Sequence, residues 1–589
     1  MFFYNKYYKL HKINMNNYCL YLFAFSILIL HSYAAPPGVP TLDWADHSYA
    51  LVQINHQATA YESLVNSQPF VTIKVSWSVW SGEQGEIAQV YLENKLDCKV
   101  INVWTGPTQD RFATFDYNTS GRYSMYVKLC NADGCSASQT VEVVIADTDG
   151  KHLKPLQYTW QENNKPYTYN TDHTVAAYFV EWGVYGRSFP VDKVPTPNLS
   201  HILYGFIPIC GGDGINDSLK SITGSFEALQ RSCAGRDNFK VSIHDPWAAL
   251  QKPQTGVSAW NEPYKGNFGQ LMAAKLANPN LKVLASIGGW SLSDPFYHMH
   301  DARTRQIFVE SVREFVLTWK FFDGIDIDWE FPGGKGANPN VGDVERDNNT
   351  YIALLGELRA MLDQVQIQTN RTLELTTAIS AGIDKIAAVN YDRAQQYLDK
   401  IFVMSYDFKG AWSNTDLGHQ TALYGSAWKP NEPYTANVAV DALLAQRVNP
   451  KKLVLGVAMY GRGWTGVHNY DSDNPFSGVA VGPITGTWEN GVVDYRQIAK
   501  NISRYEYAFD DVAKAAYVFD RASGDLISYD SERSVLAKGE YVLQRRLGGL
   551  FAWEIDADNG DLLNAMHIGL MKTNRNGLGT NSRLIHNEL

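Results

Sequence analysis

Three acidic residues alternate with apolar residues near the middle of the chain. The segment reads Asp323-Gly-Ile-Asp326-Ile-Asp328-Trp-Glu330, inside an apolar run typical of a buried strand. Because strand side chains alternate between faces, Asp326, Asp328 and Glu330 project the same way, in steps of about 7 Å. Carboxylates gathered on one buried face resist ionisation, so at least one should keep its proton at neutral pH. The pattern therefore predicts a general acid, with Glu330 as the candidate.

A metal site or a structural cluster of ion pairs would use the same residue types. Few His or Cys residues lie nearby in the sequence, and we expect neither a metal ion nor a cofactor. Asp323 lies an odd number of residues from the other three carboxylates, so it points to the opposite face of the strand or precedes it. We therefore predict a structural role for Asp323.

The segments around the acidic strand alternate between two types. Short apolar stretches are separated by amphipathic segments such as 304–320 and 351–365. The predicted strands are 175–182, 202–209, 282–290, 322–330, 373–380, 401–408, 453–460 and 549–553. A βα unit repeated about eight times predicts an α/β fold closed into a parallel (β/α)8 TIM barrel, with a doubly wound open sheet as the rival.

Polar and aromatic residues recur at the carboxyl ends of these strands, where such barrels hold their active sites. The residues concerned are Tyr178 on the first strand, Glu330 on the fourth, Tyr406 and Asp407 on the sixth, Tyr460 and Arg462 after the seventh, and Trp553 on the eighth. A single Tyr or Trp would more often belong to the core. Several strand ends that converge on one place indicate a site.

At these residues the chain resembles the family 18 glycoside hydrolases. The family signature Asp-x-x-Asp-x-Asp-x-Glu corresponds to Asp323, Asp326, Asp328 and Glu330, and Ser286-Ile-Gly-Gly matches a second motif on the third strand. Nearly the whole mature chain is similar to the chitinase A type of bacteria and baculoviruses. The resemblance implies hydrolysis of β-1,4-linked N-acetylglucosamine in chitin, with the substrate's own acetamido oxygen as the nucleophile.

The resemblance also implies roles for individual residues. Glu330 would protonate the glycosidic oxygen. Asp328 would accept a hydrogen bond from the acetamido N–H, and Asp326 would share a proton with Asp328. Tyr406 would hold the acetamido group. We therefore expect catalysis by Glu330, Asp328, Asp326 and Tyr406.

Further residues match positions that bind substrate in the family. Trp553 would form the floor beneath the distorted sugar, because a flat apolar ring stacks on a sugar face. The other candidates around the scissile bond and along the cleft are Asp407, Met404, Tyr460, Arg462, Trp182, Trp290, Trp412 and Trp488. Trp247 and Trp260, with Trp80, could form an exposed track that leads a chitin chain to the cleft. Ordinary packing is the alternative for each of these Trp residues.

The domain organisation follows from changes in pattern along the chain. Residues 1–35 are typical of a signal peptide, with lysines before an apolar run over 18–30. The β-rich stretch 36–148 predicts an immunoglobulin-like or fibronectin III-like sandwich, and the polar stretch 149–172 predicts a linker or hinge. The barrel is expected over 173–572, with a small α+β insertion at about 462–530 and a tail over 573–589.

The overall charge limits the partners. The formal net charge of −10 argues against nucleic acid or an anionic membrane and favours a neutral ligand. After the leader no segment is long and apolar enough to span a bilayer, so we expect no membrane insertion. We also expect a monomer.

The cysteines and sequons fit an oxidising compartment. We predict disulfides between Cys130 and Cys135, across a turn, and between Cys210 and Cys233. Cys98 is left over and is expected to be a small buried hydrophobe. Sequons that predict a glycoprotein occur at Asn118, Asn198, Asn216, Asn348, Asn370 and Asn501.

The last four residues, His586-Asn-Glu-Leu589, differ by one residue from the His-Asp-Glu-Leu retrieval signal of the endoplasmic reticulum. They predict residence in the lumen of the endoplasmic reticulum, with a retrieval receptor as partner. Asn587 replaces an acidic residue of the signal, so secretion of part of the protein is also expected.

Three other functions compete with a chitinase. A catalytically silent chitin lectin on the same barrel would usually lack the terminal acid, and Glu330 is present. An endo-β-N-acetylglucosaminidase acting on glycoproteins would share the barrel and the acid, but the sandwich and the cleft aromatics suit a long polymer. A lumenal interaction protein is supported only by the tail.

Overall fold

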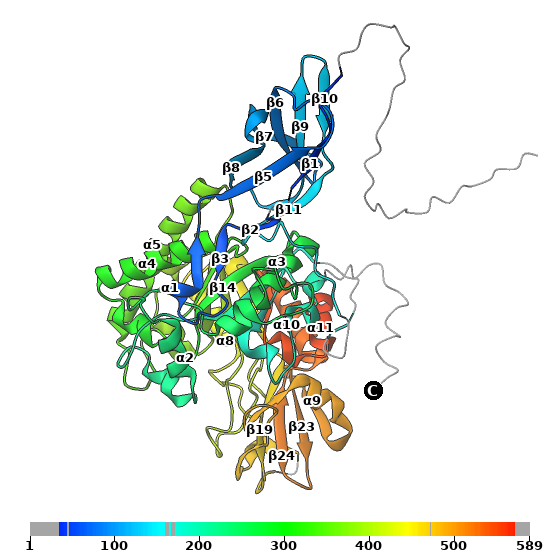
Figure 1. The fold of residues 1–589 in the computed structure, drawn as a ribbon. Helices are drawn as coiled ribbons and strands as arrows, with labels where there is room; N and C mark the ends of the chain where they lie inside the picture. The colour runs from blue at the N-terminus through cyan, green and yellow to red at the C-terminus, as the bar shows by residue number, and fades with distance from the viewer. Residues whose placement is uncertain (1–34, 44–45, 160–163, 166–170, 472, 572–589) are drawn as a thin grey trace, which may run out of the picture.

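The computed structural model describes residues 35–43, 46–159, 164–165, 171–471 and 473–571. The predicted signal peptide, except Ala35, and the retrieval-like tail lie outside these residues. Figure 1 shows a blue β-sandwich at one end of the molecule, a barrel in the middle, and a small orange sheet at the other end.

Eight parallel strands form a closed barrel in the order β12-β13-β14-β15-β16-β17-β18-β25. Their bounds are β12 Thr174–Val180, β13 His201–Ile207, β14 Lys282–Gly288, β15 Gly324–Asp328, β16 Glu374–Ser380, β17 Lys400–Met404, β18 Leu453–Ala458 and β25 Gly549–Trp553. The last strand pairs with the first, with Thr174 opposite Gly549. This closure confirms the predicted TIM barrel and excludes the open sheet.

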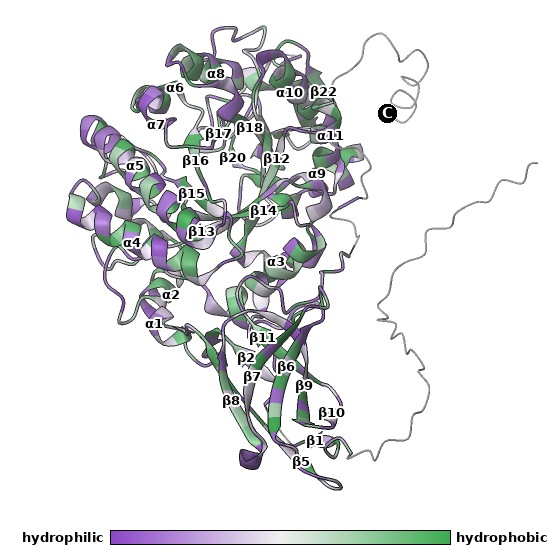
Figure 2. Cartoon of the chain, turned by 90° about the horizontal axis from the view of Figure 1, so that it is seen from above, coloured by the Kyte–Doolittle hydropathy of each residue, from purple (hydrophilic) through white to green (hydrophobic). Residues whose placement is uncertain are grey.

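Helices surround the barrel and bury their apolar sides against it. The longer ones are α2 Ser225–Ser232, α3 Gly266–Ala277, α4 Ala302–Thr318, α5 Val344–Thr369, α8 Ala436–Ala445, α10 Glu532–Arg545 and α11 Asp561–Gly569; α6 Ile383–Ala387 and α7 Tyr391–Ala394 are short. Asp301 and Asp343 cap α4 and α5 by accepting hydrogen bonds from backbone N–H groups. Figure 2 shows polar colour on the outer sides of α4 and α5 and apolar colour on inner strands such as β14.

The amino-terminal sandwich consists of two sheets that face each other. One has the order β1-β5-β8 (Pro40–Leu42, Val71–Val79, Phe112–Tyr117), and the other β2-β11-β9-β6-β7 (Ser48–Ala50, Val141–Ala146, Gly121–Asn131, Ile87–Asn94, Val100–Pro107), with β10 Gly134–Ala137 beside β9. Alternate residues of β5 and β9 point inward, so Ile73, Trp77 and Val127 are buried between the sheets.

A short excursion from the sandwich packs on the barrel. It consists of β3 Val52–Ile54, α1 Tyr61–Leu64 and β4 Val65–Ser67. Tyr61 is 2% exposed and belongs to the barrel's hydrophobic core. Trp319 donates a hydrogen bond to its hydroxyl over 3.2 Å, and the Arg236 guanidinium lies 4.3 Å from its ring centroid. The excursion therefore anchors the sandwich to the barrel.

The described part of the predicted linker is also packed. Leu153 and Leu156 are buried, and the Leu156 N–H donates to the carbonyl of Ala273 on α3 over 2.9 Å. His152 lies 3.0 Å from Glu262. These contacts hold residues 150–156 against the barrel, whereas a hinge would need a free backbone.

The insertion lies between β18 and β25. Its sheet has the order β20-β19-β24-β23-β22, with β21 beside β19. The bounds are β19 Tyr460–Thr465, β20 Gly482–Pro483, β21 Val492–Asp494, α9 Tyr495–Lys500, β22 Glu506–Asp510, β23 Ala515–Asp520 and β24 Asp525–Tyr529. Tyr460 and Arg462 therefore lie on the first strand of the insertion, beside the barrel.

Both predicted disulfides, Cys130–Cys135 and Cys210–Cys233, are present. The prediction for Cys98 is wrong: it is exposed, because it lies in the turn between β6 and β7. The sequon at Asn216 is also misleading, because this side chain is buried and its amide donates to the carbonyls of Ile209 and Gly211. Within the described ranges no helix is long and apolar enough to cross a membrane.

Candidate active site

The acidic strand runs through the barrel, and its carboxylates lie inside. Asp326 and Asp328 are buried on β15, and Glu330 is partly exposed two residues beyond the strand. The Gly-Gly pair of the second motif lets β14 approach this strand closely. A Cβ on Gly288 would lie 2.2 Å from the carbonyl oxygen of Asp328, and the Gly289 N–H donates to the same oxygen over 2.7 Å. The two motifs therefore meet at the end of β15.

Asp326 is held by three hydroxyl groups, two from the neighbouring strands β14 and β16 and one from β12. Tyr178 and Ser286 donate to Oδ2, each over 2.9 Å, and Thr376 donates to Oδ1 over 2.7 Å. Burial raises the pKa of Asp326, and these hydrogen bonds lower it by stabilising the charged form. Among the described residues, Asp326 therefore accepts more hydrogen bonds on its carboxylate than Asp328 or Glu330 does.

Asp328 has an environment of the opposite kind. Its Oδ1 is buried and accepts no hydrogen bond from the described residues. Burial, together with the charges of Glu330 and Asp326, raises the pKa of Asp328 well above its usual range. This environment favours the protonated form of Asp328, and its buried Oδ1 is available to a ligand group.

Glu330 meets the requirements of a general acid. Burial and the charge of Asp407 raise its pKa to about 8, so it is protonated at neutral pH. The adjacent backbone is fixed: the Glu330 N–H donates to Ser293 Oγ over 2.8 Å, and the Phe331 N–H donates to the Tyr297 hydroxyl over 3.1 Å. A positioned, protonated carboxyl can give a proton to a leaving group.

Tyr406, Asp407, Tyr460 and Arg462 form one wall of the site. The Tyr406 ring is buried, with its centroid 6.2 Å from that of Tyr460. Asp407 Oδ1 accepts from the Tyr460 hydroxyl over 2.7 Å and from Arg462 Nε over 2.8 Å, while Oδ2 accepts from Arg462 Nη2 over 2.9 Å. The insertion therefore contributes two residues that hold Asp407 beside the acid.

Trp553 ends β25 above the barrel core. Its ring lies parallel to that of Phe206, with centroids 5.8 Å apart, and 5.3 Å from the ring of Tyr178. It is partly buried, as is Met404 at the end of β17 in the same apolar cluster. One ring face can thus be fixed by aromatic neighbours while the other serves a ligand.

The remaining candidate Trp residues are 42% to 89% exposed, so packing does not explain them. They are Trp80, Trp182, Trp247, Trp260, Trp290, Trp412 and Trp488. Three of them contact residues of the site: Trp290 with Phe331, Trp182 with Phe206, and Trp412 with Arg462. Trp488 contacts Arg187, which pairs with Glu554 next to Trp553. Trp247 and Trp260 lie in the β13–β14 connection, which is joined to the segment of Trp182 by a hydrogen bond from the Asp245 N–H to Glu181 over 3.1 Å.

Sequence reasoning missed several residues of the site. Phe206 supports Trp553, and a strand-end rule applied to β13 would have found it. Thr376 binds Asp326 from inside a strand, where nothing in the local pattern distinguishes it. Arg187 forms ion pairs with Glu554 and Asp556 just beyond Trp553, and its position in a loop gave no signal.

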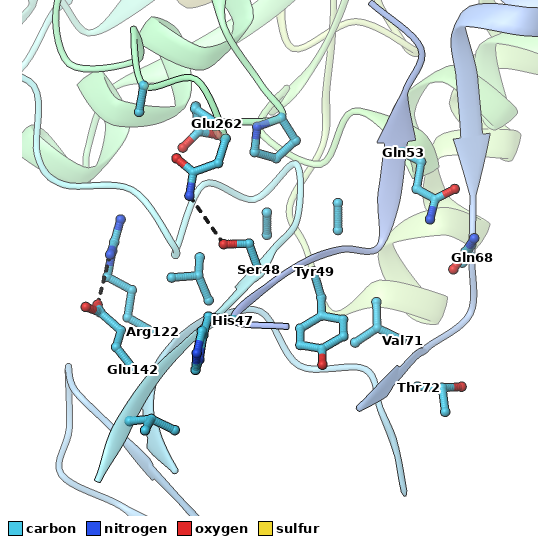
Figure 3. Close-up of a pocket in the computed structure, with 17 residues that line it drawn as sticks. His47, Ser48, Tyr49, Gln53, Gln68, Val71, Thr72, Arg122, Glu142 and Glu262 are labelled. Carbon is cyan, nitrogen blue, oxygen red and sulfur yellow. Dashed lines mark hydrogen bonds and ion pairs between the residues drawn. The ribbon is translucent and has the colours of Figure 1, made fainter. Parts of the chain in front are cut away.

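A separate cleft of about 1000 Å³ lies where the sandwich meets the barrel, as Figure 3 shows. Tyr49, Gln53 and Gln68 line it from the sandwich side, and Glu262 lines it from the barrel side. None of the predicted catalytic residues lies on its walls. Of its two acidic groups, Glu142 forms an ion pair with Arg122, and Glu262 lies 3.0 Å from His152.

A barrel with this acidic strand and strand-end wall defines a glycoside hydrolase. The model of the glycosyl hydrolases family 18 matches residues 174–558, and that of the chitinase A N-terminal domain matches residues 34–171. The chain belongs to family 18 of the glycosyl hydrolases.

Its relatives are similar over most of their length. The chain is 66% identical to the chitinase of Autographa californica nuclear polyhedrosis virus over 90% of this chain and 96% of the relative. It is 48% identical to chitinase A of Pseudoalteromonas piscicida over 91% of this chain and 69% of that relative. Among solved structures, the catalytic domain of chitinase B from Arthrobacter TAD20 is 30% identical, with a TM-score of 0.58 over 70% of this chain and 96% of that one.

Proposed function

We propose that the protein is a chitinase that hydrolyses β-1,4 linkages of N-acetylglucosamine polymers with retention of configuration. The observation that carries this proposal is the pairing of a protonated Glu330 with Asp328, whose buried Oδ1 has no hydrogen-bond donor among the described residues. The family and the chitinase names of the relatives support the same substrate class.

The two groups divide the reaction between them. Glu330 gives its proton to the glycosidic oxygen as the bond to the anomeric carbon breaks. The acetamido N–H of the same sugar donates to Asp328 Oδ1, which satisfies that buried oxygen and directs the acetamido carbonyl oxygen to the anomeric carbon. The substrate thus supplies its own nucleophile, as in family 18 enzymes. Ionised Glu330 then takes a proton from the incoming water.

Asp326 and Tyr406 control charge around this step. The ring formed by the acetamido oxygen carries positive charge, so a negative charge close by stabilises it. Three hydroxyl groups keep Asp326 the more acidic carboxylate, so the shared proton lies on Asp328 at first. As positive charge develops on the ring, this proton passes to Asp326 and leaves Asp328 negative. The Tyr406 hydroxyl provides a donor for the acetamido group, and burial raises its pKa so that it keeps its proton.

The aromatic residues supply binding energy at a distance from the scissile bond. Trp553 stacks under the sugar that is distorted, while Trp182, Trp290 and Trp412 offer exposed faces to neighbouring sugars. Binding of these remote sugars offsets the strain at the reacting one. We therefore propose that the substrate is a chain of several sugars.

The test uses purified mature protein and Glu330→Gln with colloidal chitin and chitotetraose. Products are followed by mass spectrometry, and oligosaccharide binding is measured in parallel. The exposed Glu345→Gln on α5 is the matched control for loss of one carboxylate. Oligosaccharides released by the parent and the control, with Glu330→Gln binding but not cleaving, support the proposal.

The alternatives give different results with chitotetraose or with a high-mannose glycoprotein as a further substrate. A lectin would bind chitotetraose in all three forms and cleave it in none. An endo-β-N-acetylglucosaminidase would release glycans from a high-mannose glycoprotein, which a chitinase leaves intact. Either result would contradict the proposed function.

We also propose that the protein enters the secretory pathway and is partly retrieved to the endoplasmic reticulum. The two disulfides support passage through an oxidising compartment. The test compares secretion of the full chain with that of a chain lacking residues 586–589, both carrying an internal tag. Faster release of the shortened chain is expected, and equal release would contradict retrieval by this tail.

A further inference from the structure

A buried ion pair lies behind the wall that holds Tyr406 and Asp407. Lys538 on α10 and Asp530, just after β24, are both fully buried and 2.7 Å apart. The Lys538 ammonium donates to three acceptors: Asp530 Oδ2, Thr421 Oγ1 over 2.6 Å and the Gly456 carbonyl over 3.0 Å. All three of its protons are thus used, at a place where no ligand can reach them.

Asp530 joins the exit of the insertion to the barrel. Its Oδ2 also accepts from the Ala458 N–H at the end of β18 over 2.9 Å, and its Oδ1 accepts from Ser534 Oγ over 2.7 Å. A buried ion pair is weak evidence of a role in stability, because apolar residues of similar volume often stabilise a protein as well. Its geometry instead fixes several chain segments at one point.

Gln420 and Thr421 connect the region of the buried ion pair to the active site. Thr421 Oγ1, which contacts both charged groups, donates to the Ser405 carbonyl over 3.0 Å. Gln420 accepts from the Asp407 N–H on its side chain and donates to the Tyr460 carbonyl, each over 3.0 Å. The residues on both sides of Tyr406 are therefore held by two adjacent residues of one loop.

Gly456 provides a second path to the Tyr406 ring. Its carbonyl accepts from Lys538, and its N–H donates to Ser405 Oγ over 3.0 Å. A Cβ at this position would lie 2.9 Å from Cε1 of Tyr406, so the ring packs directly against the Gly456 backbone. Movement of Lys538 would thus shift the surface on which Tyr406 rests.

We propose that the Lys538–Asp530 pair positions Tyr406 and Asp407, and that Thr421 connects the pair to the backbone of Ser405. None of the three residues touches the substrate; they act by fixing the backbone over residues 405–408. The inference rests on the proposed function, in which Tyr406 holds the acetamido group and the charge of Asp407 keeps Glu330 protonated.

The test replaces Thr421 with Val, which keeps the shape and removes the hydroxyl, and with Ser, which keeps the hydroxyl. We expect Thr421→Val to lower kcat on chitotetraose about tenfold with KM changed less than twofold. The alkaline limb of the pH profile of kcat should move to lower pH, because a displaced Asp407 raises the pKa of Glu330 less. Thr421→Ser should stay within twofold of the parent. Thermal unfolding of each variant verifies that the assays report folded protein.

A second variant, Lys538→Met with Asp530→Leu, removes the pair without leaving one buried charge alone. We expect it to fold and to show the same loss of kcat and the same shift in pH profile. If it does not fold, Thr421→Val decides. Folded variants with the parent's kcat and pH profile would overturn the inference, as would equal losses in the Val and Ser variants. A parent that binds but does not cleave would contradict the proposed function instead.

Discussion

Replacing Asp407 with Asn is expected to move the alkaline limb of the pH profile to lower pH. The charge of Asp407 is one cause of the raised pKa of Glu330, which lies at about 8. Two unit charges that are about 6 to 12 Å apart interact by roughly 1.4 to 2.8 kcal/mol at an effective dielectric constant of about 20. Since one pKa unit corresponds to about 1.36 kcal/mol, removal of the Asp407 charge should lower the pKa of Glu330 by about one to two units.

The direction follows from the role of Glu330 as an acid. Cleavage requires protonated Glu330, so activity falls as pH rises through its pKa. In Asp407→Asn this fall should begin at lower pH, because less repulsion opposes ionisation. Arg462, which pairs with Asp407 in the parent, then acts on Glu330 uncompensated and lowers its pKa further.

The assay is kcat/KM on chitotetraose from about pH 5 to 10, since this ratio reports the pKa values of the free enzyme. Arg462→Met provides a control of opposite sign: it leaves Asp407 unpaired and should move the limb to higher pH. Asp237→Asn, which removes an exposed charge elsewhere, should move nothing. A limb that stays in place or rises in Asp407→Asn would refute this account of the acid.

Three further predictions concern binding and stability. Trp553→Ala should lower kcat/KM on chitotetraose about 10- to 100-fold in steady-state kinetics, because roughly 1.5–3 kcal/mol from burial of the ring is lost. Trp553→Phe should recover part of this loss, and an unchanged kcat/KM in Trp553→Ala would remove Trp553 from the site. Replacing Cys210 and Cys233 by Ser should lower the free energy of unfolding, measured with denaturant, by about 3 kcal/mol, because the bridge joins residues 23 apart in the sequence. As a control, the reduced parent should be as stable as the variant. Tyr61→Ala should cost about 3–5 kcal/mol and make the junction sensitive to protease, and an unchanged digestion pattern would contradict the anchoring of the sandwich.

The sequence predicted the barrel and its acidic strand because both depend on local patterns. Eight buried strands leave apolar runs, and the alternation of Asp326, Asp328 and Glu330 requires a pleated strand whatever surrounds it. Asp323 precedes that strand and forms an ion pair with Lys275 over 2.6 Å, which confirms its structural role.

Contacts between distant segments could not be predicted in this way. Tyr61 belongs to a helix of four residues in the sandwich region, and nothing nearby indicates that it packs beside Trp319. The exposure of Cys98 and the burial of Asn216 depend on which turn or loop the chain forms, and neither a cysteine count nor a sequon contains that information. The Lys538–Asp530 pair likewise joins residues that no motif marks.

The anchoring of Tyr61 has a consequence for attack on an ordered solid. A sandwich that rotated freely would let one adsorbed molecule present its cleft at many inclinations. A sandwich fixed by Tyr61 and by the packed segment 150–156 presents the active site of the barrel at one inclination to any surface that the sandwich contacts (Figure 1). Crystallites whose facets expose polymer chains at different tilts should then erode unevenly, with one facet receding faster than the others under the microscope.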